Sequence, residues 1–217
     1  YVAKHDQDLF MANDDWFRGL SLKYGPDGGV YITDWHDFGE CHVNDGSHRT
    51  SGRIYKMTWG TPSAVSMDLQ KLNQQELVSL LSHKNEWFVR HARRILHERT
   101  AFGVDQSQAE SLIKSRLKGG RLTETQILRF LWALYGMDAL STEDLVQWTH
   151  HRSEHVRRWA IKLIFDQGEP QNFGELVLEG AFRRGIRGRI VEMAYGDPSP
   201  KVLLAIASSM QQVQPAN

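Results

Sequence analysis

Apolar side chains recur at every second position in short stretches near the start of the chain, which is the period of a half-buried β-strand. Residues 19–24 and 53–59 alternate in this way, and residues 30–34 are rich in side chains that favour strands. Pro26-Asp27-Gly28-Gly29 lies between the first two stretches and has the composition of a tight turn. We therefore predict a small antiparallel sheet of three strands within residues 1–62.

After Pro62 the apolar residues recur with the 3.6-residue period of an α-helix. Asn73 and Glu76 have the spacing of a capping box at the first helix start, and Thr123 or Thr125 and Ser141 or Thr142 are further candidate N-caps. The pattern predicts nine helices, near residues 73–81, 88–96, 107–117, 122–135, 141–148, 156–165, 173–184, 187–195 and 198–212.

Part of this helical pattern repeats. Leu77-Val78 matches Leu145-Val146, and the same offset along the chain relates Phe88 to Val156, Ala92 to Ala160 and Ile95 to Leu163. A looser copy begins at Ile190. Repeated helix pairs bury their apolar faces by stacking on one another. We therefore predict a mainly α fold, a HEAT/armadillo-like α-α superhelix over residues 63–217 that follows the β segment. A non-repetitive helical bundle is the alternative.

Composition narrows the possible functions. The chain has 26 Lys and Arg against 26 Asp and Glu, so its net charge gives no general case for binding nucleic acid or anionic membranes. Its one cysteine, Cys41, cannot form an intrachain disulfide, a Cys-rich zinc site or the CxxCH motif that attaches c-type haem. No apolar run approaches the ~20 residues of a membrane span. The polar start of the chain does not resemble a signal peptide.

The best candidate for chemistry follows the second predicted strand. Asp34, His36, Cys41 and His42 are of the residue types that bind a divalent metal such as zinc, and Asp34 and His36 leave a strand on the same face. Carboxylates in this segment are also suited to calcium, and Asp37 and Glu40 are further candidate binding residues.

Other interpretations of the same residues remain open. His36 and Asp37 have the character of loop caps, and Cys41 of a small buried apolar residue. A thiolate nucleophile at Cys41 with His42 as its base is a further possibility. His151 and His155 have the i, i+4 spacing of metal ligands, but the neighbouring arginines favour a solvated turn.

Arginines form local basic patches in the helical region. Arg90, Arg93 and Arg94 are candidates for binding an acidic partner or a phosphate backbone, with a second group at Arg183, Arg184, Arg187 and Arg189. The alternative is that these arginines face solvent and pair with nearby acids, namely Glu86, Glu98, Glu179 and Glu192. We place the tryptophans of the apolar faces in the core: Trp87, Trp132, Trp148 and Trp159.

Residues 14–18, 24–42 and 51–56 together resemble the last blade of the β-propeller of a membrane-bound dehydrogenase family of planctomycete and verrucomicrobial type. That propeller is similar to those of glucose and sorbosone dehydrogenases. The helical region is similar to the same family at residues 86–96 and at Asp197-Pro198-Ser199-Pro200. The resemblance implies a partial propeller blade followed by HEAT-like repeats, in a periplasmic or otherwise exported protein.

The resemblance also implies partners: the other propeller blades and a haem domain, neither of which this chain contains. Three hypotheses follow. The helices are a scaffold or protein-interaction module, with no catalysis by this chain alone. Alternatively, residues 34–42 belong to a metal or substrate site of a sugar-dehydrogenase-like enzyme. In the third hypothesis the repeats are a free-standing module that binds a protein or, less favoured by the neutral charge, nucleic acid.

Overall fold

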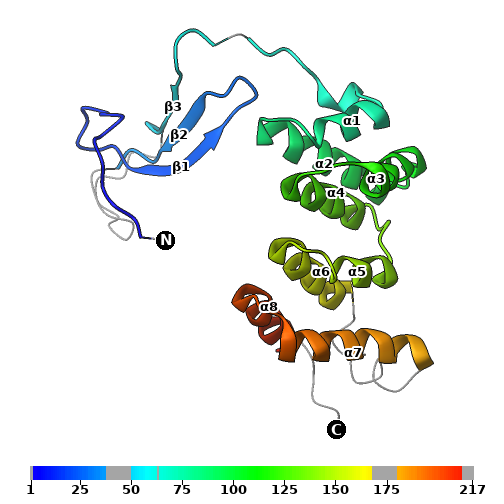
Figure 1. The fold of residues 1–217 in the computed structure, drawn as a ribbon. Helices are drawn as coiled ribbons and strands as arrows, with labels where there is room; N and C mark the ends of the chain where they lie inside the picture. Colours follow the sequence, from blue (N-terminus) through cyan, green and yellow to red (C-terminus); the bar gives the residue numbers. More distant parts are fainter. Residues whose placement is uncertain (1, 38–49, 63, 168–179, 212–217) are drawn as a thin grey trace. The chain divides into compact units, whose positions relative to one another are not determined.

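A computed structural model describes residues 2–37, 50–62, 64–167 and 180–211, with the backbone alone for residues 180–184. The chain divides into two compact units, Tyr1–Met67 and Asp68–Asn217. This division lies close to the predicted boundary after residue 62. Figure 1 shows strands in the first unit and pairs of helices that follow one another in chain order in the second.

The N-terminal unit contains a three-stranded antiparallel sheet in the order β1-β2-β3, as the alternation predicted. The strands are β1 (Gly19–Tyr24), β2 (Val30–Asp34) and β3 (Arg53–Met57). The turn between β1 and β2 places Gly28 at a φ of 81°, which residues with a Cβ rarely adopt. The Asp27 carboxylate accepts a hydrogen bond from the Gly29 N–H at 3.0 Å. The turn residues recognised in the sequence thus join the two strands.

Strand β1 lies at one edge of the sheet, and its side chains are exposed along its whole length. Leu20 and Leu22 are 64% and 68% exposed, whereas Ile32 on the central strand is buried. Phe10 and Phe17 lie edge-on to Tyr55 with ring centroids 5.2 and 5.9 Å away. The N-terminal unit therefore has an apolar cluster but leaves an apolar edge strand uncovered.

The second unit contains one short 3₁₀-helix and, in its described residues, eight α-helices. The elements are η1 (Leu69–Lys71), α1 (Gln74–Leu80), α2 (Glu86–Ala101), α3 (Ser107–Gly119), α4 (Glu124–Gly136), α5 (Thr142–Trp148), α6 (Glu154–Gln167), α7 (Gly180–Gly196) and α8 (Pro200–Met210). The predicted caps at Asn73, Thr123 and Ser141 are confirmed, each as part of a reciprocal capping box. None of the described helices is long and apolar enough to cross a bilayer.

The prediction of two helices that are interrupted between residues 184 and 187 is wrong. Helix α7 runs without interruption from Gly180 to Gly196, through Gly185 and Gly188. The helix tolerates these glycines because Ile186, Ile190 and Met193 recur at helical spacing and are buried. The predicted start near residue 173 lies outside the described residues.

The offset found in the sequence is also present in the placement of the helices. The shift along the chain that relates Leu77 to Leu145 also relates α1 to α5 at both of their ends, and the start of α2 to the start of α6. The turns match as well, since the Nδ1 atoms of His83 and His151 accept hydrogen bonds from the N–H groups of Asn85 and Ser153, at 3.0 and 3.1 Å. The two helix pairs are therefore built in the same way.

The second helix of each pair packs against the second helix of the next, so that α2, α4, α6 and α8 form a continuous row. We call this the second-helix row. One connected core fills the space between the helices, and its largest fully buried side chains include Phe130, Leu77, Leu81, Ile95, Leu96, Ile113, Leu131, Leu134, Leu145 and Ile161. Burial of these side chains fixes which faces of the second-helix row stay accessible.

Candidate functional site

Asp34, the first residue of the predicted metal site, ends β2 with its side chain fully buried. Its Oδ1 accepts hydrogen bonds from the N–H groups of Arg18 at 2.8 Å and His36 at 2.9 Å, and its Oδ2 accepts one from Arg53 Nε at 2.9 Å. Burial opposes ionisation, but the N–H donors and the Arg53 guanidinium outweigh it and hold the pKa of Asp34 below its usual value. In the described structure Asp34 therefore holds backbone and guanidinium groups together.

His36 lies beside Asp34 with a left-handed backbone, at a φ of 51°. Its Nδ1 is 2.7 Å from Ser51 Oγ, and its Nε2 is 3.3 Å from a carboxylate oxygen of Asp14. That same oxygen is 2.7 Å from Arg53 Nη2. The backbone N–H of Trp16 and then Arg53 lower the pKa of Asp14. Both ring nitrogens of His36 thus have polar neighbours within the unit.

The remaining members of the predicted metal site, Cys41 and His42, and the candidate binding residue Glu40 lie outside the described residues. Asp37 is buried, and its carboxylate accepts a hydrogen bond from Trp35 Nε1 at 3.3 Å. Within the described part of the chain, no group of three or more His, Cys, Asp and Glu side chains has the arrangement to hold a metal ion. The four-residue metal site therefore stays a prediction.

Two tryptophans lie between two cations across α2, α4 and α6. Arg93 lies over the ring of Trp132, with its guanidinium carbon 5.4 Å from the ring centroid. Trp132 packs edge-to-face on Trp159, with centroids 5.0 Å apart, and Lys162 Nζ lies 5.3 Å from the Trp159 centroid. We call these four residues the cation–tryptophan ladder. It spans three neighbouring members of the second-helix row.

The ladder tryptophans are half-buried and pack against the core. The prediction that Trp132 and Trp159 lie on apolar helix faces agrees with this packing, although neither ring is fully buried. Their contacts with Arg93 and Lys162 were not predicted. Trp159 and Lys162 are three residues apart on one helix, a spacing that brings side chains together. That spacing was the sequence signal for half of the ladder. Contact between Trp132 and Trp159 depends on helix packing.

The two ladder cations have no ion-pair partner in the part of the chain that the structure describes. Within the described residues, neither Arg93 nor Lys162 makes an ion pair with a carboxylate. Burial, and then the positive charge of Arg90, lower the pKa of Arg93, which is the direction expected for a desolvated cation beside a like charge. The ladder is therefore a partly desolvated, positively charged surface.

Other arginines of the helical unit differ from the ladder cations because they form ion pairs with carboxylates. Arg94 pairs with Glu98 at 3.3 Å, as predicted. Arg189 pairs with Glu192 at 3.0 Å, as in the alternative interpretation, but its side chain is only 15% exposed and does not face solvent. Glu86 pairs with Arg129, which lies on α4. Glu179 and the side chains of Arg183 and Arg184 lie outside what the structure describes.

A pocket of about 300 Å³ borders the ladder between α6 and α8. Its lining residues are Trp159, Lys162, Leu163, Asp166, Ser208 and Ser209. Asp166 accepts a hydrogen bond from the Tyr135 hydroxyl, and burial followed by this bond raises the pKa of Tyr135 to about 12. The ladder thus lies next to a pocket that is large enough to hold a single side chain.

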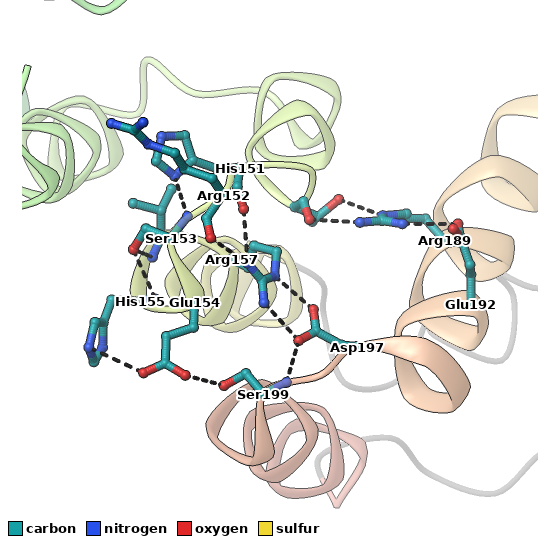
Figure 2. A network of polar contacts seen from close by, with 12 residues as sticks. His151, Arg152, Ser153, Glu154, His155, Arg157, Arg189, Glu192, Asp197 and Ser199 are labelled. Atoms are coloured by element: carbon teal, nitrogen blue, oxygen red, sulfur yellow. Dashed lines mark hydrogen bonds and ion pairs between the residues drawn. The ribbon is translucent and has the colours of Figure 1, made fainter. Parts of the chain in front are cut away.

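A separate polar network joins the last two helix pairs, as Figure 2 shows. Arg157 binds Asp197 in a bidentate pair, with Nε 2.7 Å from Oδ2 and Nη2 2.8 Å from Oδ1. The Arg157 Nη1 donates to the backbone carbonyls of His151 and Arg152 at 3.0 Å. Because every one of these partners belongs to the fold, this network connects α6 to the turn before α8 rather than forming a free anion site.

His151 takes part in the turn and not in a metal pair with His155. Its Nδ1 accepts the Ser153 N–H, whereas His155 Nε2 lies 3.6 Å from Glu154. Burial, and then the neighbouring Arg152, lower the pKa of His151. An accepting Nδ1 must be unprotonated, so hydrogen bonding and charge both favour the neutral ring.

The stability of the helical unit is therefore expected to fall with pH in the acidic range. A histidine whose folded pKa lies below its unfolded value of about 6.5 contributes fully above the unfolded value and loses that contribution as pH falls through the folded pKa. The urea midpoint of wild type should drop more between about pH 8 and pH 5 than that of His151→Asn, which keeps an acceptor but does not titrate. Equal pH dependence in the two proteins would contradict this role.

Comparisons of the chain with protein-family models, curated proteins and solved structures found no match. The function is therefore inferred from the geometry of the molecule.

Proposed function

We propose that the helical unit is a HEAT-like repeat scaffold that binds a protein partner through the second-helix row, with no catalysis by this chain alone. The observation that carries the proposal is the cation–tryptophan ladder. Tryptophan and arginine are the residues that most often dominate binding energy at protein interfaces. Here they lie together on a half-buried surface beside a pocket, with their charge left unneutralised within the described residues.

The repeat architecture supports this proposal. Helix pairs that recur with the same caps and turns stack into extended arrays, whose long surfaces serve as binding faces. The constant offset between α1–α2 and α5–α6 and the unbroken second-helix row have this character. The ladder then occupies the first three helices of the row, α2, α4 and α6, which contribute side chains to one surface.

We further propose that the N-terminal unit is a partial β-propeller blade that packs on additional β structure. Propeller blades are antiparallel sheets, usually of four strands. The unit supplies three strands, and the edge strand β1 exposes Leu20 and Leu22. An uncovered apolar edge strand is a site for pairing with another chain segment, which agrees with the missing blades implied by the family resemblance.

Site-specific photo-cross-linking tests the scaffold proposal. A photoreactive phenylalanine derivative is placed at Ser208, which is exposed and lines the pocket beside Lys162, in the otherwise unchanged chain. We expect a discrete cross-linked protein, identified by mass spectrometry. The purified partner should then bind wild type and bind Arg93→Gln/Lys162→Gln at least about tenfold more weakly.

The matched control carries the same photoreactive group at Lys118 on α3, outside the second-helix row. The same partner should not be trapped there. The proposal would be contradicted if the partner cross-links equally from both positions. It would also be contradicted if the partner binds the double variant as tightly as wild type.

A further inference from the structure

We infer that the segment recognised by the ladder is acidic and extended, with an apolar residue between two carboxylates. This inference rests on the proposed function, because it specifies the chemistry of the partner at the same surface. It follows from three features of the ladder: the sign of its charge, the order of its side chains and the distances between them.

The charge of the ladder selects an anion. Neither Arg93 nor Lys162 makes an ion pair within the described residues, although Asp166 lines the same pocket as Lys162, and Arg90 adds a further positive charge close to Arg93. Placing a carboxylate at each end would relieve the repulsion and supply charge-assisted hydrogen bonds. Arg94, which already pairs with Glu98, has less to gain. An acidic partner is thus the complement of this surface.

The order of the side chains in the ladder indicates which type of residue the partner places between its two carboxylates. The two tryptophan rings separate Arg93 from Lys162 and offer an aromatic surface. The pocket beside Trp159 is of a size to accept one side chain. An apolar or aromatic residue in the middle of the segment would bury this aromatic surface, whereas a uniformly charged segment would leave it exposed to water.

The distances along the ladder set the spacing of the carboxylates. Steps of 5.4, 5.0 and 5.3 Å lead from the Arg93 guanidinium over both rings to Lys162 Nζ, so the two cations lie no more than about 16 Å apart. An extended chain advances about 3.3 Å per residue, and its side chains alternate between two faces. Residues two positions apart therefore share the face toward the ladder, and four residues span about 13 Å. The expected pattern is an acidic residue, one residue, an apolar residue, one residue and a second acidic residue.

A protein segment fits the surface better than nucleic acid. Nucleic-acid binding depends on many cations that neutralise successive phosphates, whereas the chain has no net charge and the ladder supplies two cations.

Fluorescence anisotropy with labelled synthetic peptides tests the inference on the full chain. The probe is a 12-residue Gly/Ser peptide with a central Glu-Gly-Leu-Gly-Glu core. In the comparison peptides both Glu are replaced by Gln or by Lys. We expect the Glu peptide to bind at least about tenfold more tightly than either one, with an affinity that falls as salt rises. Arg93→Gln/Lys162→Gln should lose about tenfold of this affinity, and Arg94→Gln should change it less than twofold.

Each other outcome overturns the inference in a distinguishable way. If the Gln peptide binds as well as the Glu peptide and the double variant weakens both, the surface binds protein but does not select acids. Tighter binding of a 12-nucleotide oligothymidylate would assign the surface to nucleic acid. If the Glu peptide does not bind, or if Arg94→Gln weakens it as much as the double variant, acidic recognition by the ladder is wrong. The cross-linking experiment then decides separately whether the second-helix row binds any protein.

Discussion

Replacing Asp197 by alanine is expected to destabilise the helical unit by about 3 kcal/mol. The carboxylate receives both arms of Arg157, and the two side chains are only 4% and 11% exposed. It also accepts the Ser199 N–H at 2.9 Å, which fixes the turn into α8. Removing Asp197 leaves a desolvated guanidinium without its counter-ion and frees the last helix pair. The loss of the Arg157–Asp197 ion pair should lower the urea midpoint of unfolding, measured by tryptophan fluorescence.

The control for this prediction is Glu192→Ala on the same helix pair. Glu192 also pairs with an arginine, Arg189, but its side chain is 69% exposed. Exposed pairs contribute about 0–1 kcal/mol, so this variant should remain close to wild type. If Asp197→Ala proves as mild as Glu192→Ala, the network in Figure 2 does not hold the helix pairs together.

Asp34→Ala is expected to unfold the sheet of the N-terminal unit while the helical unit stays intact. The variant removes the acceptor of two backbone N–H groups and of Arg53 from a buried position. A sheet of three strands has little stability to lose. Hydrogen exchange of the amides in β1, β2 and β3 should accelerate by about tenfold or more, because hydrogen bonds to a charged group are among the strongest in a protein.

Asp15→Asn serves as the control, since Asp15 is an exposed carboxylate in the same unit. It should leave exchange in the sheet unchanged, and neither variant should alter the urea midpoint of the helices. Unchanged exchange in Asp34→Ala would show that the strands do not depend on this carboxylate. Its role would then have to be sought in the predicted metal site.

Local patterns were sufficient to predict most of the secondary structure. The strands follow period-2 alternation around a turn made by Gly28, and the helix starts follow side-chain caps at Asn73, Thr123 and Ser141. The break placed within α7 failed because glycine lowers helix propensity, whereas burial of neighbouring apolar residues decides the outcome. Propensity is a local quantity and burial is not.

The candidate site was less predictable from the sequence. Arg93 was recognised as part of a basic patch and Trp132 and Trp159 as core residues, but nothing local shows that the three meet. Their contact requires α2, α4 and α6 to pack in register. Sequence reasoning instead favoured residues 34–42, where the ligand types are adjacent in the chain. In the structure, the described members Asp34 and His36 have partners in the fold.

Side-chain oxidation footprinting tests the central claim most directly. Hydroxyl radicals report the accessibility of each tryptophan with and without the purified partner trapped at position 208. The scaffold account predicts that oxidation of Trp132 and Trp159 falls when the partner binds, while Trp148, which lines a pocket beside α3 and α5, is oxidised as before. Protection of Trp148 with no change at Trp132 and Trp159 would place the partner elsewhere and contradict the account.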